Sequence, residues 1–296
     1  MIRKYVGPPS RRSKTRSQGT SLRAISLNGS SVEQMTWRDP RDGNPVKIAL
    51  AAGETVVGTF VRMPTIEAVE ICAHAGCQFL IIDNEHTPVD WEKTAAMVLA
   101  AEAAGATSII RLPTWGRERI TKALDAGADG VMIPQVEDGR VTREVVAASR
   151  YGPSGTRGTA TNRNSGYGMK MSLPEYIEAA NRSTLVIVQI ESVEGVGKAD
   201  EIAAVDGVDC IFVGLSDLSV RLGVPGDMGA PALLDALAEV GEACARHDKA
   251  LGVPVGSVEM ALSFRNRGAR FIATGDVGVL AQGMRRFVEG VARSAG

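Results

Sequence analysis

Short runs of apolar, mostly β-branched residues alternate with longer amphipathic segments from residue 46 onward. A continuous apolar run of this length is typical of a parallel strand that is buried on both faces. Eight such runs occur: Val56–Phe60, Phe79–Asp83, Ser108–Arg111, Gly130–Pro134, Leu185–Glu191, Cys210–Gly214, Ala250–Val255 and Arg270–Gly275. Helical patterns separate them: Thr65–Ala75, Trp91–Ala104, Arg117–Ala126, Arg143–Arg150, Val193–Ala204, Ala232–His247, Val258–Arg267 and Val277–Ala292.

Eight repeated βα units predict an α/β protein with a closed (β/α)8 barrel, or TIM barrel, because buried parallel strands need helices on their outer faces. Several predicted helices end at a glycine just before the next strand, as a left-handed C-cap requires. These glycines are Gly76, Gly105, Gly127 and Gly268. An open doubly wound sheet is the alternative fold, and no GxGxxG sequence follows an early strand to support it.

The chain of 296 residues is compatible with one barrel plus an extension, since such barrels commonly hold about 250 residues. The first 30 positions contain seven basic residues and no acid, without an apolar period. We therefore expect a disordered basic extension at 1–45 and a barrel domain at 46–296. An organelle transit peptide or an arm for an anionic surface would have a similar composition, so the role of this segment stays open.

Charge and cysteine content exclude several classes of partner. A net charge of −1 gives no whole-chain reason to expect nucleic acid or an anionic membrane. No apolar stretch reaches the roughly 18 to 20 residues that span a bilayer, which predicts a soluble protein. The four cysteines lack CxxC spacing, so neither a structural zinc site nor a thioredoxin-like motif is expected. Reduced core thiols in a cytoplasmic protein are the expectation.

Polar residues collect where the predicted strands end, which is where the chemistry of a barrel enzyme lies. Gln189 and Glu191 end one strand, and Asp217 follows the glycine break after the next. Two carboxylates at neighbouring strand ends suit a hard divalent cation, which prefers oxygen ligands and accepts water and substrate in its other positions. We therefore predict a metal site at Glu191 and Asp217, and acids favoured by a helix dipole are the alternative.

The chain from residue 46 resembles the HpcH/HpaI aldolases, metal-dependent class II pyruvate aldolases of the citrate lyase superfamily. The resemblance rests on motifs in order: IIDNEH (81–86), IIRLP (109–113), MIPQV (132–136), RYGPSGTRG (150–158), VQIE (188–191) and VGLSDLS (213–219). It implies that Glu191 and Asp217 hold Mg2+, Mn2+ or Co2+. It further implies that Arg111 binds the pyruvate carboxylate, that His86 is the acid/base group, and that the protein is a homohexamer, a trimer of dimers.

The implied reaction is reversible retro-aldol cleavage of a 4-hydroxy-2-oxo acid to pyruvate, or a related 2-oxo acid, and an aldehyde. The residues suit this carbon–carbon lyase chemistry, because a chelated cation stabilises the enolate, a guanidinium fork grips a carboxylate, and an imidazole can take the 4-hydroxyl proton. The expected partners are these small molecules. Rival functions are a CoA-thioester lyase of the same superfamily, a Schiff-base aldolase, for which no lysine stands at a strand end, and a non-catalytic binding barrel.

Several rim residues keep more than one interpretation. Asp83 either positions His86 or a metal-bound water, or caps its loop. Arg157 either anchors a glycine-rich loop or contacts the substrate. Asn84 replaces the glycine that is usual in the resembled family, and its side chain either narrows the pocket or adds a hydrogen bond, while asparagine tolerates the positive φ of a turn. Candidates for substrate binding, besides Arg111, are Gln189, Gly214 and Ser216.

Asp125 lies fourteen positions after Arg111, where the resembled family has an aspartate that pairs with the catalytic histidine. It ends the predicted third helix, and barrel helices run antiparallel to their strands, so it is expected at the rim opposite His86. The resemblance therefore predicts that Asp125 serves His86 of a neighbouring subunit. A solvated acid at a helix end is the alternative.

Overall fold

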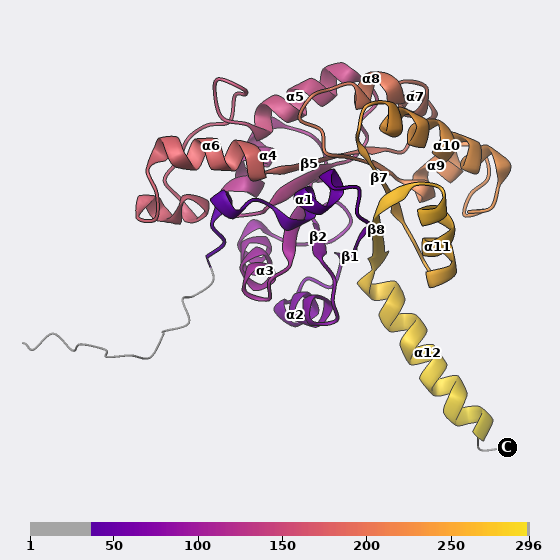
Figure 1. Ribbon diagram of the computed structural model, residues 1–296. Helices are drawn as coiled ribbons and strands as arrows, with labels where there is room; N and C mark the ends of the chain where they lie inside the picture. The colour runs from indigo at the N-terminus through magenta and orange to yellow at the C-terminus, as the bar shows by residue number, and fades with distance from the viewer. Residues whose placement is uncertain (1–36, 295–296) are drawn as a thin grey trace, which may run out of the picture. The chain divides into compact units, whose positions relative to one another are not determined.

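Eight parallel strands form a closed barrel in the computed structural model, which describes residues 37–294 (Figure 1). Each strand pairs with its neighbour in sequence, and β8 closes the barrel against β1. The strands are β1 (Val56–Val61), β2 (Phe79–Asp83), β3 (Thr107–Arg111), β4 (Gly130–Ile133), β5 (Leu185–Ile190), β6 (Cys210–Val213), β7 (Ala250–Pro254) and β8 (Ala269–Gly275). This topology confirms the predicted fold class, and each strand lies within a residue or two of its expected range.

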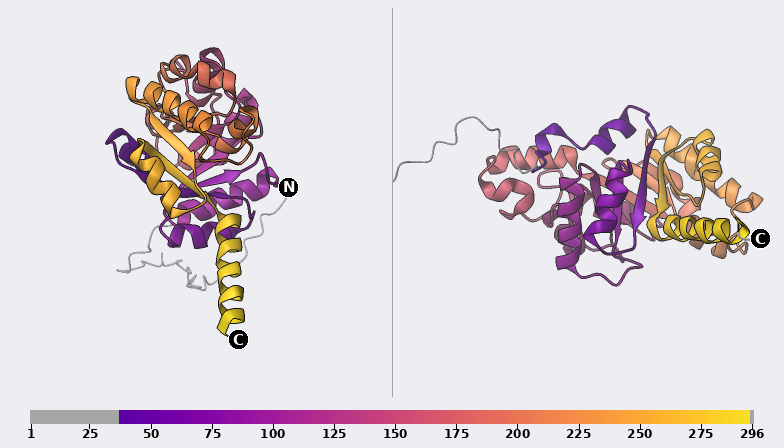
Figure 2. Two further views of the ribbon diagram at one scale, coloured as in Figure 1. Left: turned by 90° about the vertical axis from the view of Figure 1, so that its right-hand side faces the viewer. Right: turned by 90° about the horizontal axis from the view of Figure 1, so that it is seen from below.

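Helices surround the strands on their outer side (Figures 1 and 2). Those that alternate with the strands are α2 (Ile66–His74), α3 (Trp91–Ala103), α4 (Arg117–Asp125), α5 (Gly139–Ser149), α7 (Val193–Gly197), α8 (Ala199–Ala203), α10 (Pro231–Arg246), α11 (Val258–Asn266) and α12 (Asp276–Ser294). Elements that the sequence pattern did not predict are η1 (Pro40–Asp42), α1 (Pro45–Ala51), η2 (Arg163–Gly168), α6 (Leu173–Ser183) and α9 (Leu215–Arg221).

Local capping explains where several helices begin and end. The N-cap side chains that accept a main-chain N–H of the first turn are Thr65, Asp90, Asp138, Ser192 and Ser257. Asp138 places the start of α5 at Gly139, four residues before the expected start at Arg143. The four predicted C-cap glycines all have φ between 79° and 101°, which confirms their assignment.

Strand side chains alternate between the barrel interior and the layer beneath the helices. The interior contains Phe79, Ile81, Ile109, Met132, Ile187, Phe212 and Phe271. The outer layer contains Leu80, Ile82, Ile110, Val131, Val188 and Ile211. Both layers are buried, so each strand appears in the sequence as an unbroken apolar run. The Phe79 and Phe271 rings stack at 3.9 Å between centroids, and a Cβ on Gly58 would lie 2.5 Å from the Phe79 ring.

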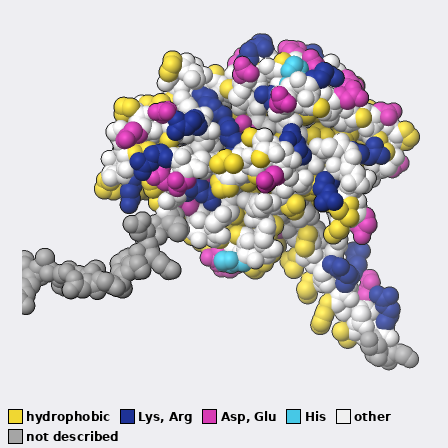
Figure 3. Space-filling model, viewed as in Figure 1, with side chains coloured by type: hydrophobic (Ala, Val, Ile, Leu, Met, Phe, Trp, Pro, Cys, Tyr) yellow, Lys and Arg dark blue, Asp and Glu magenta, His cyan; other side chains and the backbone are white. Residues whose placement is uncertain are grey.

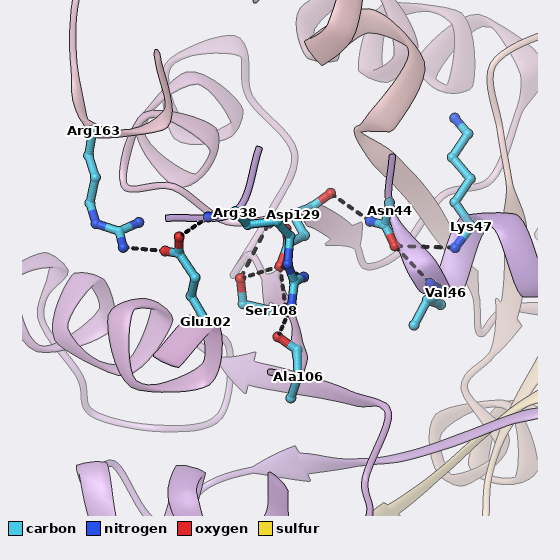
Figure 4. Close-up of polar contacts among 9 residues, drawn as sticks. All are labelled: Arg38, Asn44, Val46, Lys47, Glu102, Ala106, Ser108, Asp129 and Arg163. Carbon is cyan, nitrogen blue, oxygen red and sulfur yellow. Dashed lines mark hydrogen bonds and ion pairs between the residues drawn. The ribbon is translucent and has the colours of Figure 1, made fainter. Parts of the chain in front are cut away.

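The described chain is ordered before residue 46, the expected start of the barrel domain. Arg38 donates from its main chain to Glu102 and from Nη1 to Asp129 Oδ2 at 2.9 Å (Figure 4). Asn44 caps α1 by accepting from two amides of its first turn. Residues 37–45 therefore belong to the N-terminal end of the barrel, whereas residues 1–36 of the expected extension lie outside the described residues.

Helix α12 differs from the other barrel helices because its side chains from Val277 to Arg293 are exposed. Its apolar residues repeat at helical spacing and are 43–69% exposed: Val277, Leu280, Met284, Phe287, Val288 and Val291. Figure 1 shows α12 running away from the strands beyond β8, and Figure 3 shows hydrophobic side chains along it. On the outer side of β1, where an eighth helix would lie, Val57 is 48% exposed. Neither α12 nor any other helix within 37–294 has the length and apolar content needed to cross a membrane.

Candidate active site

Glu191 follows β5 directly, and its carboxylate is fixed from two sides. Oε1 accepts the main-chain N–H of Gln135 at 2.9 Å, and Oε2 accepts from Nε2 of Gln189. Gln135 has a φ of 54°, an uncommon conformation for a residue other than glycine. Burial raises the pKa of Glu191, the Gln189 hydrogen bond opposes this, and the charge of Glu85 adds to it. The side chain is thus held in place, and its pKa lies above the ordinary value of a glutamate.

Asp217 lies after the next strand, β6, in the first turn of α9. Its side chain is exposed and lines the cavity at the C-terminal ends of the strands. Its charge raises the pKa values of both Glu191 and Glu85, which places three carboxylates in one region. Gly214 makes this arrangement possible: a Cβ there would lie 2.5 Å from Oε2 of Glu191 and 2.9 Å from Nε2 of Gln189. A glycine is therefore required at position 214, between the end of β6 and the start of α9.

Asp83, the last residue of β2, is fully buried and organises the loop that follows. Oδ1 accepts the main-chain N–H groups of Glu85 and His86 at 3.1 and 3.2 Å. The same carboxylate accepts from Arg111, Nε to Oδ1 at 3.0 Å and Nη2 to Oδ2 at 2.6 Å. Burial is the largest single effect and would raise the pKa of Asp83. The hydrogen bonds and charge of Arg111, together with the main-chain hydrogen bonds of Glu85 and His86, outweigh it, and the pKa is lowered. Asp83 therefore caps the loop and also holds Arg111.

Arg111 ends β3 and is almost fully enclosed. Its Nε/Nη2 edge binds Asp83, and Nη1 lies 3.4 Å from Oε2 of Glu85. The guanidinium carbon lies 4.6 Å above the centroid of the Phe60 ring, a cation–π distance. The planar group lines the cavity with one edge already used, so an incoming carboxylate meets the remaining Nη donors.

His86 and Glu85 lie side by side in the loop after β2. The His86 side chain is 56% exposed and lines the cavity, with Nε2 at 3.8 Å from Oε2 of Glu85. Glu85 is more enclosed, and its Oε2 is buried without a hydrogen-bond partner within 37–294. Burial raises the pKa of Glu85 to about 6, although Arg111 opposes this shift. Glu85 is part of the IIDNEH motif, but its spacing in the sequence did not by itself indicate a role.

Asn84 turns away from the cavity. Its Nδ2 donates to Thr94 Oγ1 on α3 at 3.1 Å, and its main-chain N–H donates to the carbonyl of Arg111 at 3.0 Å. Its φ is not positive, so the expected left-handed turn at this position is absent. Asparagine in place of glycine adds a hydrogen bond to the adjacent helix and does not line the pocket.

A cavity of ≈ 570 Å³ opens at the C-terminal ends of the strands. Its lining brings together most of the predicted site residues: His86, Arg111, Gln189, Gly214, Ser216 and Asp217. Glu191 adjoins this region: Gln189 of the lining donates to its carboxylate, and a Cβ on Gly214 would lie 2.5 Å from its Oε2. The opposite part of the lining includes Arg62, Met228, Val255 and Met260, none of which the sequence pattern singled out.

The residues present fit a divalent cation with an incomplete protein shell. Within the described chain no group of three or more His, Cys, Asp or Glu side chains is arranged to hold a metal. Two carboxylates at adjacent strand ends nevertheless offer hard oxygen donors. Two more buried oxygens, Oε1 of Gln189 and Oε2 of Glu85, have no hydrogen-bond partner among residues 37–294. Such a site would leave coordination positions for water and for a chelating substrate.

Asp125 is not brought into this cavity. It ends α4 and pairs through Oδ1 with Nη2 of Arg157 at 2.8 Å. The Arg157 side chain is 2% exposed and lies 4.5 Å above the Tyr151 ring. In this chain Arg157 anchors its loop to the end of α4. Asp125 does not line the cavity that His86 of the same chain lines.

A closed (β/α)8 barrel with a carboxylate cluster, a held arginine and an exposed histidine at its C-terminal rim has the arrangement of a barrel enzyme whose active site lies at the strand ends. The family model for HpcH/HpaI aldolase/citrate lyase matches residues 57–282. The chain belongs to the HpcH/HpaI aldolase/citrate lyase family. The resemblance seen in the motifs is thereby confirmed.

Relatives and solved structures support the same assignment. The chain is 36% identical to a hydroxypyruvate/pyruvate aldolase of Roseovarius nubinhibens, covering 83% of this chain and 96% of the relative. It is 36% identical to a 4-hydroxy-2-oxovalerate aldolase of Novosphingobium aromaticivorans, covering 86% and 98%. A crystal structure of a family protein from Burkholderia cenocepacia superposes with a TM-score of 0.80 at 34% identity, covering 84% and 99%. The expected class, a carbon–carbon lyase of the aldolase type, is confirmed.

Proposed function

We propose that this protein is a divalent-metal-dependent aldolase that cleaves a 4-hydroxy-2-oxo acid to pyruvate, or a related 2-oxo acid, and an aldehyde. The observation that carries the proposal is the convergence of Glu191, Asp217, Arg111 and His86 around one open cavity at the strand ends. Glu191 and Asp217 would hold Mg2+, Mn2+ or Co2+. When bound, such an ion acts as a Lewis acid that stabilises the negative charge of an enolate.

The remaining steps belong to residues of this chain. Arg111 binds the substrate carboxylate through the Nη donors that Asp83 leaves free. His86 lies on the exposed side of the cavity, where its imidazole accepts the proton of the 4-hydroxyl. The C3–C4 bond then breaks, the aldehyde leaves, and the electron pair stays on the 2-oxo acid as its enolate. Protonation at C3 completes the reaction, and the reverse sequence makes the aldol.

A second candidate is a CoA-thioester lyase, because the family model is named for citrate lyase as well as for the aldolases. The cavity of ≈ 570 Å³ is of ordinary size for a small molecule. Both named relatives act, by their names, on small oxo acids. We therefore favour the aldolase over the CoA-thioester lyase. A binding barrel without activity would not need acids, an arginine and a histidine together at one cavity.

An activity assay tests the function directly. Purified protein stripped of metal with a chelator is expected to show no pyruvate release from 4-hydroxy-2-oxo acids, and added Mg2+, Mn2+ or Co2+ is expected to restore it. Comparing the three ions identifies the preferred metal. Equal turnover with and without chelator, or no turnover of any such acid with all three ions, would contradict the proposal.

We also propose that the protein works as a homo-oligomer, with a hexamer as the expected form. Two exposed apolar surfaces support this: the apolar face of α12 and the outer side of β1. In an oligomer, α12 of one copy of the chain would cover the outer side of β1 in a second copy. Asp125 gives a second reason: held by Arg157 outside its own cavity, it is available to the His86 of a neighbouring subunit.

Subunit mixing tests this shared pair. His86→Ala and Asp125→Ala are each expected to lose most of the activity, and oligomers formed after exchange between them are expected to regain part of it. Regain follows because some sites then combine an intact His86 with a neighbour's Asp125. Unfolding temperatures of the variants are measured first, since Arg157 loses its ion-pair partner in Asp125→Ala.

The matched control mixes His86→Ala with Glu191→Ala. Both residues serve the cavity of one chain, so no mixed oligomer contains a complete site and no activity should return. Recovery in the control as well, or no recovery in the test pair after exchange has been demonstrated by mass spectrometry, would rule out the shared pair.

A further inference from the structure

Arg62 lies at the barrel mouth and takes no part in the chemistry described above. It follows β1 directly, is exposed, and lines the same cavity as His86 and Asp217. Its main-chain N–H donates to Oδ2 of Asp276 at 3.0 Å, as does that of Met63 at 2.9 Å. The other oxygen of Asp276 accepts from the N–H of Val277. The buried carboxylate of Asp276 thus binds main-chain N–H groups of Arg62 and its neighbours, and it has no hydrogen bond or ion pair with the Arg62 guanidinium.

The Arg62 guanidinium has no hydrogen bond or ion pair with any residue from 37 to 294. The second arginine of the cavity lining is in a different situation, since Arg111 is held by Asp83 and Glu85. Gly275, at the end of β8, leaves room for the free group: a Cβ there would lie 3.3 Å from Nη2 of Arg62. The cavity therefore contains one guanidinium that Asp83 holds along one edge and one that no residue from 37 to 294 engages.

The position of Arg62 indicates which part of a substrate would meet it. In the closed strand order, β1 lies diametrically across from β5, so Arg62 stands opposite Gln189 and Glu191. The acids and Arg111 occupy the β3, β5 and β6 side, where the 2-oxo acid end would bind. The wall that continues around the mouth through β7 is mainly apolar, with Pro254, Val255 and Met260. A substrate anchored at the acids would extend along this wall toward Arg62.

We propose that Arg62 is a specificity-determining residue that binds an anionic group, a carboxylate or a phosphate, at the far end of the aldehyde. A guanidinium forms two parallel hydrogen bonds with either group, and the neighbouring apolar wall suits a short carbon chain between the two ends. This inference rests on the proposed aldolase function. It predicts that the enzyme prefers aldehydes that carry a second negative charge over neutral ones of similar size.

Matched aldehydes test the proposal in the direction of aldol formation with pyruvate and metal. One pair is succinic semialdehyde and pentanal, and the other is glycolaldehyde phosphate and glycolaldehyde. In the wild-type protein, kcat/KM for the anionic member of at least one pair is expected to exceed that for the neutral member by roughly 10- to 100-fold, because a charge-assisted bidentate contact is gained. The pair with the larger ratio identifies carboxylate or phosphate as the bound group.

Variants then assign the preference to this side chain. Arg62→Met keeps the length and removes the charge, so the anionic-to-neutral ratio is expected to fall to near one, mainly through KM for the anionic aldehyde. Arg62→Lys keeps the charge but loses the planar fork, so an intermediate ratio is expected. Arg140→Met, an exposed arginine on α5 outside the cavity, is the control and should retain the wild-type ratio.

The outcomes separate this inference from the function on which it rests. Turnover without an anionic preference, or a preference that Arg62→Met leaves intact, overturns the role of Arg62 and leaves the aldolase assignment standing. Absence of aldol formation with every aldehyde and every metal overturns both.

Discussion

Replacing Glu191 or Asp217 with alanine is expected to abolish binding of the divalent cation. We expect kcat/KM to fall roughly 10³-fold or more, which corresponds to a loss of about 4 kcal/mol of transition-state stabilisation. Both carboxylates lie at the rim of the barrel, outside the packed interior, so cooperative unfolding should persist. Calorimetric titration with Mg2+ or Mn2+ measures the loss of binding, and pyruvate release measures the loss of turnover.

Glu194→Gln is the matched control for this experiment. Glu194 follows Glu191 by three residues, but it is exposed on α7, where it pairs with Lys198. Removing its charge should leave cation affinity unchanged. Undiminished affinity in either rim variant, or an equal loss in the control, would contradict the assignment of the metal ligands.

His86→Ala is expected to reduce kcat by about 10²- to 10⁴-fold, the range typical of losing a general acid–base group, while cation affinity stays at the wild-type level. The separation follows from the structure, because the His86 ring lies on the exposed side of the cavity beside Glu85, whereas the cation ligands are proposed at β5 and β6. Steady-state kinetics and calorimetry on the same preparation check both halves.

His74→Ala serves as the comparison, since His74 is an exposed residue on α2 and not part of the cavity lining. Its kinetic constants should match those of the wild type. If His86→Ala turned over substrate at a near-normal rate, another group would have to accept the 4-hydroxyl proton.

The barrel could be predicted from the sequence because each strand is buried on both faces and therefore forms an unbroken apolar run. The helices were less certain at their ends: α5 starts earlier than expected because its N-cap, Asp138, precedes the clear amphipathic period. Helix α9 was missed because its seven residues span only two turns, too few for a period to appear. Helix α12 was predicted from its amphipathic spacing. Such spacing does not indicate which surface the apolar face covers, so the exposure of this face was not predicted.

The positions of the candidate side chains could be predicted where they lie at or directly after a strand end, as for Arg111 and Glu191, or in the turn that follows, as for Asp217. The site was not predictable where the contribution comes from the main chain. Gln135 supports Glu191 through an N–H that a left-handed backbone directs, and glutamine is not a residue type that signals this conformation. The orientation of Asn84 was likewise decided by Thr94 on α3, a tertiary neighbour that local sequence does not reveal.

The clamped state of Arg111 has a consequence for the thermodynamics of substrate binding. A long, flexible side chain normally loses rotamer freedom when it grips a ligand, at a cost of about 0.5–1.5 kcal/mol. Here Asp83 and the ring of Phe60 have already fixed the guanidinium. That entropy is lost when the chain folds, so a carboxylate arriving at the cavity meets a preorganised receptor, and more of the contact energy is expressed as affinity.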